Sequence, residues 1–187
     1  MSAHLILMTE ESSMGETLRI ILAKLFPDRR EGFDWIIIEH SGKTDLERSF
    51  PRKIRVWGKP NPHFLILRDN DGADCKALKE KLTALVPQTS HPWKIRIVCQ
   101  ELESWFLGDL DAIQTAYPGA KHKLSQKNLH KTEPDSHTNA SQLLEELTKT
   151  GAKRIRAVEI AQHMNPDKNR SHSFHVFVNS VNQFFQA

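Results

Sequence analysis

The sequence has little cysteine and no long hydrophobic run. Its two cysteines, Cys75 and Cys99, are too few for a disulfide framework or a four-ligand zinc site, and we expect both to be reduced. The longest apolar runs, such as Ile36–Ile38 and Phe64–Leu67, are far too short to span a bilayer, which excludes a membrane protein. The first residues lack a basic stretch and a cleavage signature, so the sequence predicts a cytoplasmic rather than a secreted chain.

Several catalytic motifs are also absent. No glycine-rich phosphate loop or Walker motif occurs, which excludes nucleotide hydrolysis by that route, and the G-x-S-x-G motif of serine hydrolases is missing too. The histidines of the C-terminal half have no cysteine partners and no H-x₃-H pair on an expected helix. Zinc is therefore not predicted.

The composition that remains is that of a globular chain. Of the 187 residues, 39% are hydrophobic and 26% are charged, which suits one domain with a sizeable core. Residues 1–111 carry 16 Lys and Arg against 17 Asp and Glu, whereas residues 112–187 carry 10 against 6. The basic second part could bring a phosphate backbone to an acidic site, or it could be an ordinary solvated surface, and the charge alone decides neither.

The hydrophobic pattern of the first half alternates between strand and helix. Short apolar runs predict strands at 4–8, 34–39, 63–67 and 93–99, and the segments between them have helical spacing at 15–26, 43–57 and 73–85. This alternation predicts an α/β fold with a Rossmann-like parallel four-stranded sheet flanked by helices.

The pattern becomes all-helical after Glu101. We expect helices within 102–107, 109–117, 139–150, 155–164 and 173–185, with a long polar loop over 118–138. The sequence therefore predicts a catalytic core over residues 1–108 and a helical C-terminal extension over 109–187 that packs on the core as a cap.

Acidic residues follow three of the expected strands. They are Glu10 and Glu11, Asp69 and Asp71, and Glu101 and Glu103. Because the carboxyl ends of parallel strands line the functional crevice of such a sheet, these carboxylates are expected to converge there and to need a cation such as Mg²⁺. The alternative for the D-x-D motif at residues 69–71 is an ordinary turn that caps the next helix.

A glutamate after the first strand and a D-x-D motif after the third resemble the Toprim domain. That domain is shared by topoisomerases, bacterial primases, small RNA-maturation nucleases and the overcoming-lysogenization-defect nucleases. The stretches 65–75 and 99–109, with Ser171–Phe174 and Phe177, resemble a small bacterial branch of Toprim-like proteins that are often encoded beside an ABC-type ATPase.

The resemblance implies a site for Mg²⁺ or Mn²⁺ at Glu10, Asp69 and Asp71. In the nuclease branch a further acid joins the metal ligands, here Glu101 or Glu103. A downstream lysine also joins the site, here Lys153, where it would stabilise charge on the transferring phosphoryl group.

Two positions depart from the family pattern. Glu11 stands where the pattern has glycine, so the turn after the first strand is expected to be strained or differently shaped. Met14 stands where the nuclease relatives carry an acid, which argues against a full second metal site unless Glu11 or Glu16 substitutes for it.

The resemblance leads to an expected function and to an alternative. The expected function is Mg²⁺- or Mn²⁺-dependent endonucleolytic cleavage of nucleic acid, DNA rather than RNA, as the effector of an anti-phage system that includes an ABC-type ATPase. The alternative is a regulatory or toxin-like subunit of the ATPase complex that binds nucleic acid without cutting it. The lysines of the 118–138 loop are candidate phosphate contacts or solvated side chains; they are Lys121, Lys123, Lys127 and Lys131.

Overall fold

The computed structural model of the chain describes residues 4–149 and 151–186. The remaining positions, 1–3, 150 and 187, lie outside the described residues. They include the first three residues of the core expected over 1–108, the last residue of the helix expected over 139–150 and the last residue of the extension expected over 109–187.

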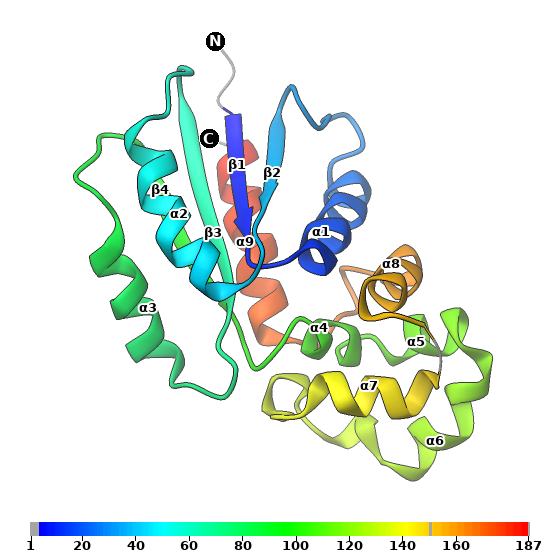
Figure 1. Cartoon of the computed structure of the whole chain (residues 1–187). Helices are drawn as coiled ribbons and strands as arrows, with labels where there is room; N and C mark the ends of the chain where they lie inside the picture. The colour runs from blue at the N-terminus through cyan, green and yellow to red at the C-terminus, as the bar shows by residue number, and fades with distance from the viewer. Residues whose placement is uncertain (1–3, 150, 187) are drawn as a thin grey trace.

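Strands and helices alternate through the first half of the chain (Figure 1). The strands are β1 (His4–Thr9), β2 (Trp35–Glu39), β3 (Pro62–Asp69) and β4 (Trp93–Val98), and the helices between them are α1 (Ser12–Leu25), α2 (Lys43–Arg55) and α3 (Cys75–Leu85). The second half is helical. It contains α4 (Glu103–Leu107), α5 (Leu110–Ala116), α6 (Lys121–Gln126), α7 (Ala140–Thr148), α8 (Lys153–His163) and α9 (His172–Gln186).

Within the described residues the strands form one four-stranded sheet in the order β2-β1-β3-β4. All three strand pairs are parallel; Leu7 of β1 lies opposite Ile37 of β2 and Leu65 of β3, and Ile66 of β3 lies opposite Ile95 of β4. Parallel neighbours require crossover connections, which α1, α2 and α3 supply. The predicted α/β fold with a parallel sheet flanked by helices is confirmed.

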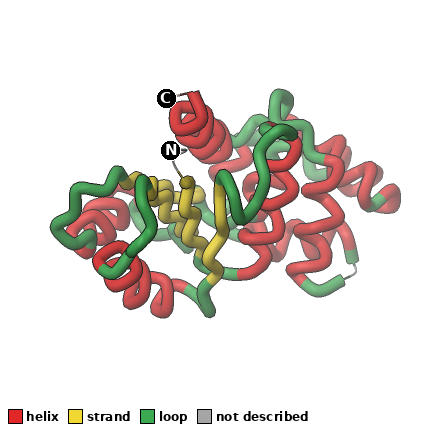
Figure 2. The backbone as a smooth tube through the Cα atoms, turned by 90° about the horizontal axis from the view of Figure 1, so that it is seen from above, coloured by secondary structure: helices red, strands yellow, loops and turns green. Residues whose placement is uncertain are grey.

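Helices cover both faces of the sheet, as the view from above shows (Figure 2). Alternate strand residues point to opposite faces: Leu5 and Leu7 join the core formed with α1 and α9, whereas Ile6 and Met8 join the core formed with α2 and α3. Burial on both faces explains why the strands are continuous apolar runs rather than alternating ones.

The C-terminal helices pack back onto the sheet core. Helix α8 lies along α1, where the Lys24 ammonium donates hydrogen bonds to the backbone oxygens of Ala161 (3.0 Å) and Met164 (2.8 Å) at the end of α8. Trp105 of α4 is fully buried, with its ring centroid 5.2 Å from that of Phe177 in α9. The extension and the sheet therefore share one hydrophobic core cluster.

The expected loop over 118–138 was wrong. The segment contains α6 and three 3₁₀ turns at Pro118–Ala120, Leu129–Lys131 and Pro134–Ser136. Leu124 and Leu129 are buried here, and a compact helical path lets the polar backbone form its own hydrogen bonds while these side chains reach the core.

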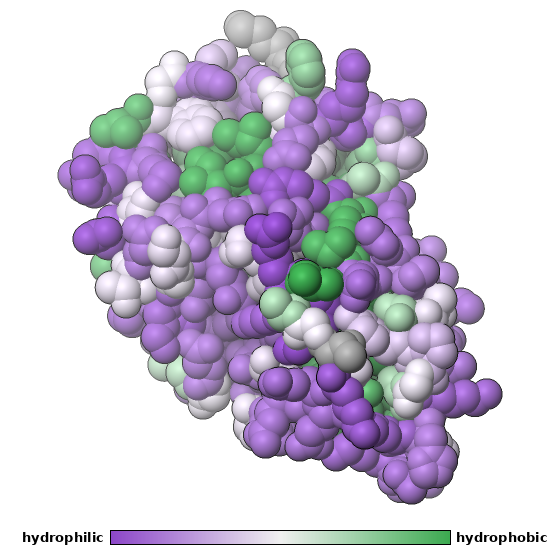
Figure 3. Space-filling view, turned by 45° about the vertical axis from the view of Figure 1, so that its right-hand side comes forward, coloured by the Kyte–Doolittle hydropathy of each residue, from purple (hydrophilic) through white to green (hydrophobic). Residues whose placement is uncertain are grey.

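Most of the visible surface is hydrophilic, with hydrophobic residues in a few patches (Figure 3). The large hydrophobic side chains that are exposed in the described residues are Phe33, Val56, Leu85 and Ile155. No helix in residues 4–149 and 151–186 has the length and apolar content needed to cross a membrane.

Candidate functional site

The carboxyl ends of β1 and β3 lie side by side at one edge of the sheet, the position that is called the crevice of an α/β sheet. Glu10 directly follows β1, and Asp69 is the last residue of the neighbouring strand β3. The chain leaves β1 toward one face of the sheet, through α1, and leaves β3 toward the other, through α3. Chain paths that diverge in this way open the space in which α/β proteins bind ligands. Glu103, the first residue of α4, enters the same site after β4.

Three carboxylates at this crevice are buried without full hydrogen bonding. Asp69 is 4% exposed and Glu103 is 2% exposed. Within the described structure, Asp69 Oδ1, Glu10 Oε2 and Glu103 Oε2 are buried and have no hydrogen-bond partner. A buried carboxylate oxygen without a partner is costly, so the three oxygens together favour a cation or a proton at this place.

The proximity of these acids changes their titration. Burial raises the pKa of Asp69 well above its ordinary value, and the neighbouring charges of Glu10 and Glu103 raise it further. Burial also raises the pKa of Glu10, against the opposing effect of Arg68, and the pKa of Glu103, against that of Lys153. Each carboxyl is thus harder to ionise than it would be in water.

Lys153 brings a positive charge to these acids from the start of α8. Its Nζ lies 2.6 Å from Glu11 Oε1 and 3.7 Å from Glu103 Oε1. Burial disfavours the ammonium form, but Glu103, Glu11 and Asp69 outweigh burial and raise the pKa of Lys153. The lysine is therefore charged at the site.

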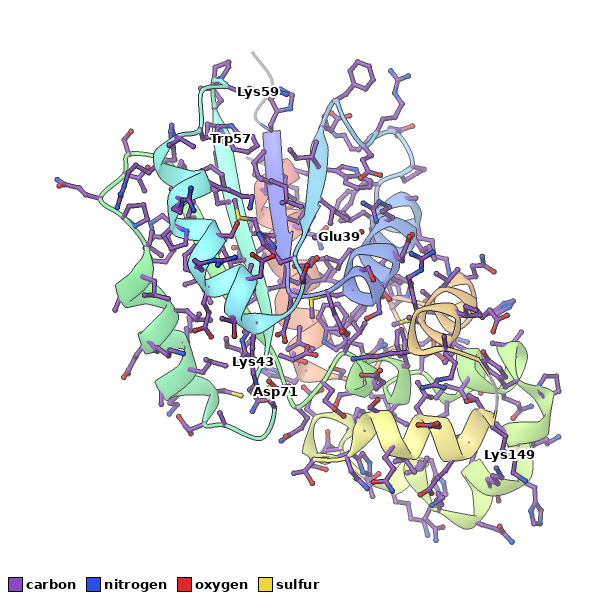
Figure 4. The ribbon with its side chains drawn as sticks, in the orientation of Figure 1. Glu39, Lys43, Trp57, Lys59, Asp71 and Lys149 are labelled. Carbon is purple, nitrogen blue, oxygen red and sulfur yellow. The ribbon has the colours of Figure 1, made fainter. Side chains whose placement is uncertain are left out.

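Asp71 lies at the rim rather than among the buried carboxylates. Its side chain is 39% exposed, and Oδ2 lies 3.1 Å from both Lys43 Nζ and Arg68 Nη1. Figure 4 shows Lys43 and Asp71 next to each other at the lower end of α2. The backbone of Asp71 is left-handed (φ 48°), and its N–H donates to the Gln100 oxygen at 3.0 Å.

Arg68 is a site residue that the sequence analysis missed. It is 5% exposed, and its guanidinium lies 3.4 Å from Glu10 Oε2, 3.5 Å from Glu47 Oε1 and 3.1 Å from Asp71 Oδ2. The available signal was an arginine inside an apolar strand, because a buried cation must lie beside anions.

Asn70 is a second residue that the sequence analysis missed. The residue is 3% exposed; its N–H donates to Val98 O at 3.1 Å, and its side-chain oxygen accepts from the N–H of Gln100. Asn70 thereby joins the turn after β3 to the end of β4. A polar residue between two acids in a tight turn is the signal that could have indicated this role.

The other candidate acids are placed differently. Glu101 Oε2 accepts a hydrogen bond from the Ser141 N–H (2.7 Å) in the first turn of α7, and Glu16 forms an ion pair with Arg19 (3.8 Å). Met14 is fully buried in the core, so Glu11, through Lys153, is the nearby residue that adds a carboxylate to the site. The expectation of a strained turn at Glu11 was wrong, because its backbone is extended (φ −147°, ψ 167°) and needs no glycine.

The donor chemistry fits a hard divalent cation, although the ligands are not preassembled. Carboxylate oxygens are what Mg²⁺ and Mn²⁺ prefer, and three buried ones have no hydrogen-bond partner in the described residues. The charges of Glu10 and Glu103 also raise the pKa of Asp69. Nevertheless, no group of three His, Cys, Asp or Glu in the described part of the chain is spaced to hold a metal ion. Arg68 and Lys153 supply the positive charge present at these acids.

A family model for a domain of unknown function, DUF4276, matches residues 9–182. The chain belongs to this family. The match includes all the site residues described above and extends to both sides of residue 108, so strands β2 to β4 and helices α1 to α8 lie within the DUF4276 unit. No curated protein and no solved structure matches the chain.

Two lysines of the 118–138 segment of this DUF4276 chain make contacts within the protein. The ammonium group of Lys123 donates to the backbone oxygen of Glu146, and the Lys127 ammonium lies 2.9 Å from Glu146 Oε2. Cys75 and Cys99 are free thiols with their sulfurs 3.6 Å apart. Burial raises the pKa of Cys99 to about 12, so its thiol is protonated at neutral pH.

Proposed function

We propose that this DUF4276 chain is a Toprim-like hydrolase that cleaves nucleic-acid phosphodiester bonds with Mg²⁺ or Mn²⁺, DNA in preference to RNA. The observation that carries the proposal is the set of buried carboxylate oxygens of Glu10, Asp69 and Glu103 that have no hydrogen-bond partner in the described residues, beside the charged Lys153. Acids that repel one another in a crevice favour a divalent cation, and a nearby ammonium suits a phosphate that arrives there.

The residues would have different roles at such a site. Glu10, Asp69 and Glu103 would hold the ion, which when bound polarises a phosphoryl oxygen and lowers the pKa of water. Lys153 would place its ammonium against the developing charge of the phosphoryl group. Arg68 holds Glu10 and Asp71 through its ion pairs, and Asn70 fixes the turn that carries Asp69 and Asp71.

Plasmid cleavage tests the proposal. The wild-type chain is expected to nick supercoiled plasmid with Mn²⁺, and EDTA is expected to stop the reaction. Asp69→Asn should reduce the rate about a hundredfold or more, the scale of losing one charge-bearing group from such a site. Glu80→Gln, an exposed acid on α3, is the matched control and should cut like wild type. Equal cutting by Asp69→Asn and wild type would overturn the proposal.

A non-cutting subunit that binds nucleic acid is the second candidate. The observation that favours it is that Arg68 and Lys153 already offset part of the acidic charge, while the described residues hold no ready ligand set. Titration calorimetry with Mn²⁺ separates the two. Absence of Mn²⁺ binding together with retained oligonucleotide binding would favour the non-cutting subunit.

The partner proposed for this chain is an ABC-type ATPase in a cytoplasmic anti-phage complex. The resemblance of residues 65–75 and 99–109 to ATPase-associated Toprim-like proteins supports it, and two free thiols suit a reducing compartment. Affinity purification from the native host is expected to recover the neighbouring ATPase. If the gene has no ATPase neighbour and the chain elutes alone, the partnership falls while the site proposal is unaffected.

A further inference from the structure

Positive charge is concentrated on one short segment of an otherwise acidic sheet domain. Residues 43–59 contain six Lys and Arg and two Asp and Glu, a net charge of +4, whereas the whole chain has +3. The rest of the first half is acidic. The segment comprises α2 and the turn after it, so the charge lies on one helix rather than over the whole surface.

Helix α2 turns its cations to solvent and connects the carboxylate site with the far end of the sheet. Its buried residues are Leu46, Phe50 and Ile54, while Arg52 and Arg55 are exposed. In Figure 4 the helix begins at Lys43, beside Asp71, and leads to Trp57 and Lys59 at the opposite end. A ligand lying along α2 would therefore reach the acids.

Three adjoining hollows form a groove along this helix, which we call the α2 groove. The first is lined by Glu11, Ser12 and Gly42, the second by Arg48, Arg52 and Lys53, and the third by Ile38, Trp57 and Lys59. Lys53 and Val56 line both the second and the third, and the Ser41 N–H, from the first, donates to Asp45 Oδ2 (3.1 Å) of the second.

Among the groove cations, Arg52 and Lys59 have no anionic partner in the described residues, whereas Arg48 lies 3.4 Å from Asp45 Oδ1. Asp45, Glu11 and Glu39 also line the hollows, so the free positive charge of the groove rests on Arg52 and Lys59. In the described residues neither Arg52 nor Lys59 forms a salt bridge or a side-chain hydrogen bond, and both are exposed. A cation with no ion pair to break can turn toward a phosphate, and each one neutralised by a nucleic-acid backbone releases a counterion.

The far end of the groove adds an apolar surface beside these cations. Val56 is 77% exposed, and Trp57 is half-buried with its ring perpendicular to that of Phe64. Exposed apolar and aromatic side chains beside a row of cations are the combination that binds single-stranded nucleic acid, because bases stack on rings while phosphates contact the cations.

We propose that the α2 groove binds one strand of nucleic acid, with phosphates on Arg52 and Lys59 and a base against Trp57, and leads it to the carboxylate site. The proposal rests on the proposed function, since it names the form in which the substrate arrives. Its test is independent of cleavage, because Arg52, Trp57 and Lys59 are separate from the acids of the site.

Binding of a fluorescein-labelled single-stranded DNA dodecamer, measured by anisotropy in EDTA, tests the groove without cutting. Arg52→Gln with Lys59→Gln is expected to weaken binding tenfold or more and to lower the salt slope by about 1.4, since each single-strand phosphate contact contributes about 0.7. The matched control is Lys76→Gln with Lys79→Gln, two exposed lysines that line a hollow on α3. The control should bind within twofold of wild type.

A second variant tests the stacking surface. Trp57→Leu keeps the apolar character of the site and is expected to weaken single-strand binding about tenfold, the effect of losing one stacked base. An unchanged thermal midpoint shows that the fold is intact. A duplex of the same sequence is expected to bind more weakly than the single strand and to be insensitive to Trp57→Leu. A duplex that binds as tightly would overturn the single-strand assignment.

The results of these assays distinguish the proposal of a binding groove from the proposal of nuclease activity. Asp69→Asn is expected to bind the dodecamer at least as tightly as wild type. If the protein binds the dodecamer through the α2 groove but never cuts nucleic acid, the nuclease proposal is overturned and the proposal of a binding groove stands. Wild-type protein that fails to bind, or equal binding by Arg52→Gln/Lys59→Gln and its control, would overturn the groove whatever the cleavage assay shows.

Discussion

At the scale of single residues, ionisation of the buried Asp69 carboxyl destabilises the fold. The carboxyl faces Glu10, Glu11, Glu103 and Lys153, and its pKa is well above the ordinary value. An acid with a raised folded-state pKa holds its proton in the folded state while the unfolded chain releases it. Wild-type stability therefore falls as pH rises from about 4, the pKa of an unfolded aspartate, through the raised pKa in the fold.

Asp69→Asn is accordingly expected to stabilise the metal-free protein. The gain should be about 1–3 kcal/mol at pH 8, where the wild-type carboxyl is most ionised, and should shrink toward pH 5 as that carboxyl takes up its proton. Urea unfolding in EDTA at both pH values measures it. A variant that is no more stable than wild type at pH 8 would show that the site already compensates the charge of Asp69.

Lys153 has the opposite effect on the same acids. Lys153→Met leaves the buried Glu103 without its ion pair, so we expect a loss of about 3 kcal/mol at pH 8. Lys168→Met, on an exposed lysine without a salt bridge in the described chain, is the control. Adding Glu103→Gln to Lys153→Met should recover most of the loss. An additive further loss would contradict the pairing of these two residues.

Sequence reasoning could select Glu10, Asp69 and Asp71 because residues after strands of a parallel sheet must lie at one edge. It could not distinguish Glu101 from Glu103. Gln100 adopts a left-handed backbone (φ 63°), which redirects the chain so that Glu101 reaches α7 while Glu103 enters the crevice. No pattern in the sequence indicates this left-handed backbone at Gln100. Arg68 was missed because its partners come from three separate segments.

At the scale of elements, the junction between α4 and α5 meets the start of α9 at Gly108. A Cβ at this position would overlap the Asn169 side-chain amide and lie 3.0 Å from the Ser171 backbone nitrogen. Asn169 in turn donates to Trp105 O at 2.7 Å, and Arg170 N–H donates to Gly108 O at 2.9 Å. The close approach of these two segments therefore requires glycine at residue 108.

Gly108→Ala is expected to destabilise the protein by about 1–3 kcal/mol, because the inserted methyl group forces Asn169 away from its hydrogen bonds. Gly119→Ala provides the control, since a Cβ there has nothing within 4 Å and the backbone is not left-handed. Thermal and urea unfolding of the two variants should separate them clearly. Equal stabilities would show that the junction can relax without cost.

The elements themselves were largely predictable in the first half of the chain. Strands buried on both faces are continuous apolar runs such as Phe64–Leu67, and proline or charged turns mark their ends. The 118–138 segment was not predictable, because Leu124 and Leu129 are isolated apolar residues in a polar stretch. They become core residues only when the segment folds against the helices around it. The local sequence pattern does not indicate that contact.

At the scale of the whole molecule, the sheet and the helical extension bury a common hydrophobic core. Leu5 and Leu7 of β1 belong to the same cluster as Phe174 and Phe177 of α9. Removing the extension would leave α1 alone on one face of the sheet and expose the rest of that face to water. Burial of each large apolar side chain contributes about 1.5–3 kcal/mol.

A fragment of residues 1–108 is therefore expected to lack cooperative unfolding. It should show shallow urea curves by circular dichroism and bind the dye ANS, as chains with exposed apolar surface do. The full chain, measured in parallel, should unfold in one sharp transition. A sharp transition for the fragment would show that the sheet is stable without α8 and α9.

The distribution of charge over the molecule was the property that the sequence analysis predicted least well. Totals for the two halves assigned the basic character to residues 112–187, since acids at the strand ends cancel the cations of α2 within the first half. The structure places cations such as Arg52 on the face of the sheet that α2 covers and the acids at the edge where the strands end, and Lys43 pairs with Asp71 where the two meet. Net charge along a chain does not give its distribution over a surface.

The packing of α8 on α1 also has a consequence for the order of biosynthesis. A ribosome completes all four strands, with Glu10, Asp69 and Glu103, well before it makes Lys153. The nascent sheet therefore carries its cluster of acids without their ammonium partner until α8 emerges and docks. The ion pairs of Lys153 with Glu11 and Glu103 therefore form late, after those of Arg68 become possible. A prematurely terminated product that lacks α8 can contain every strand while its acidic site is still incomplete.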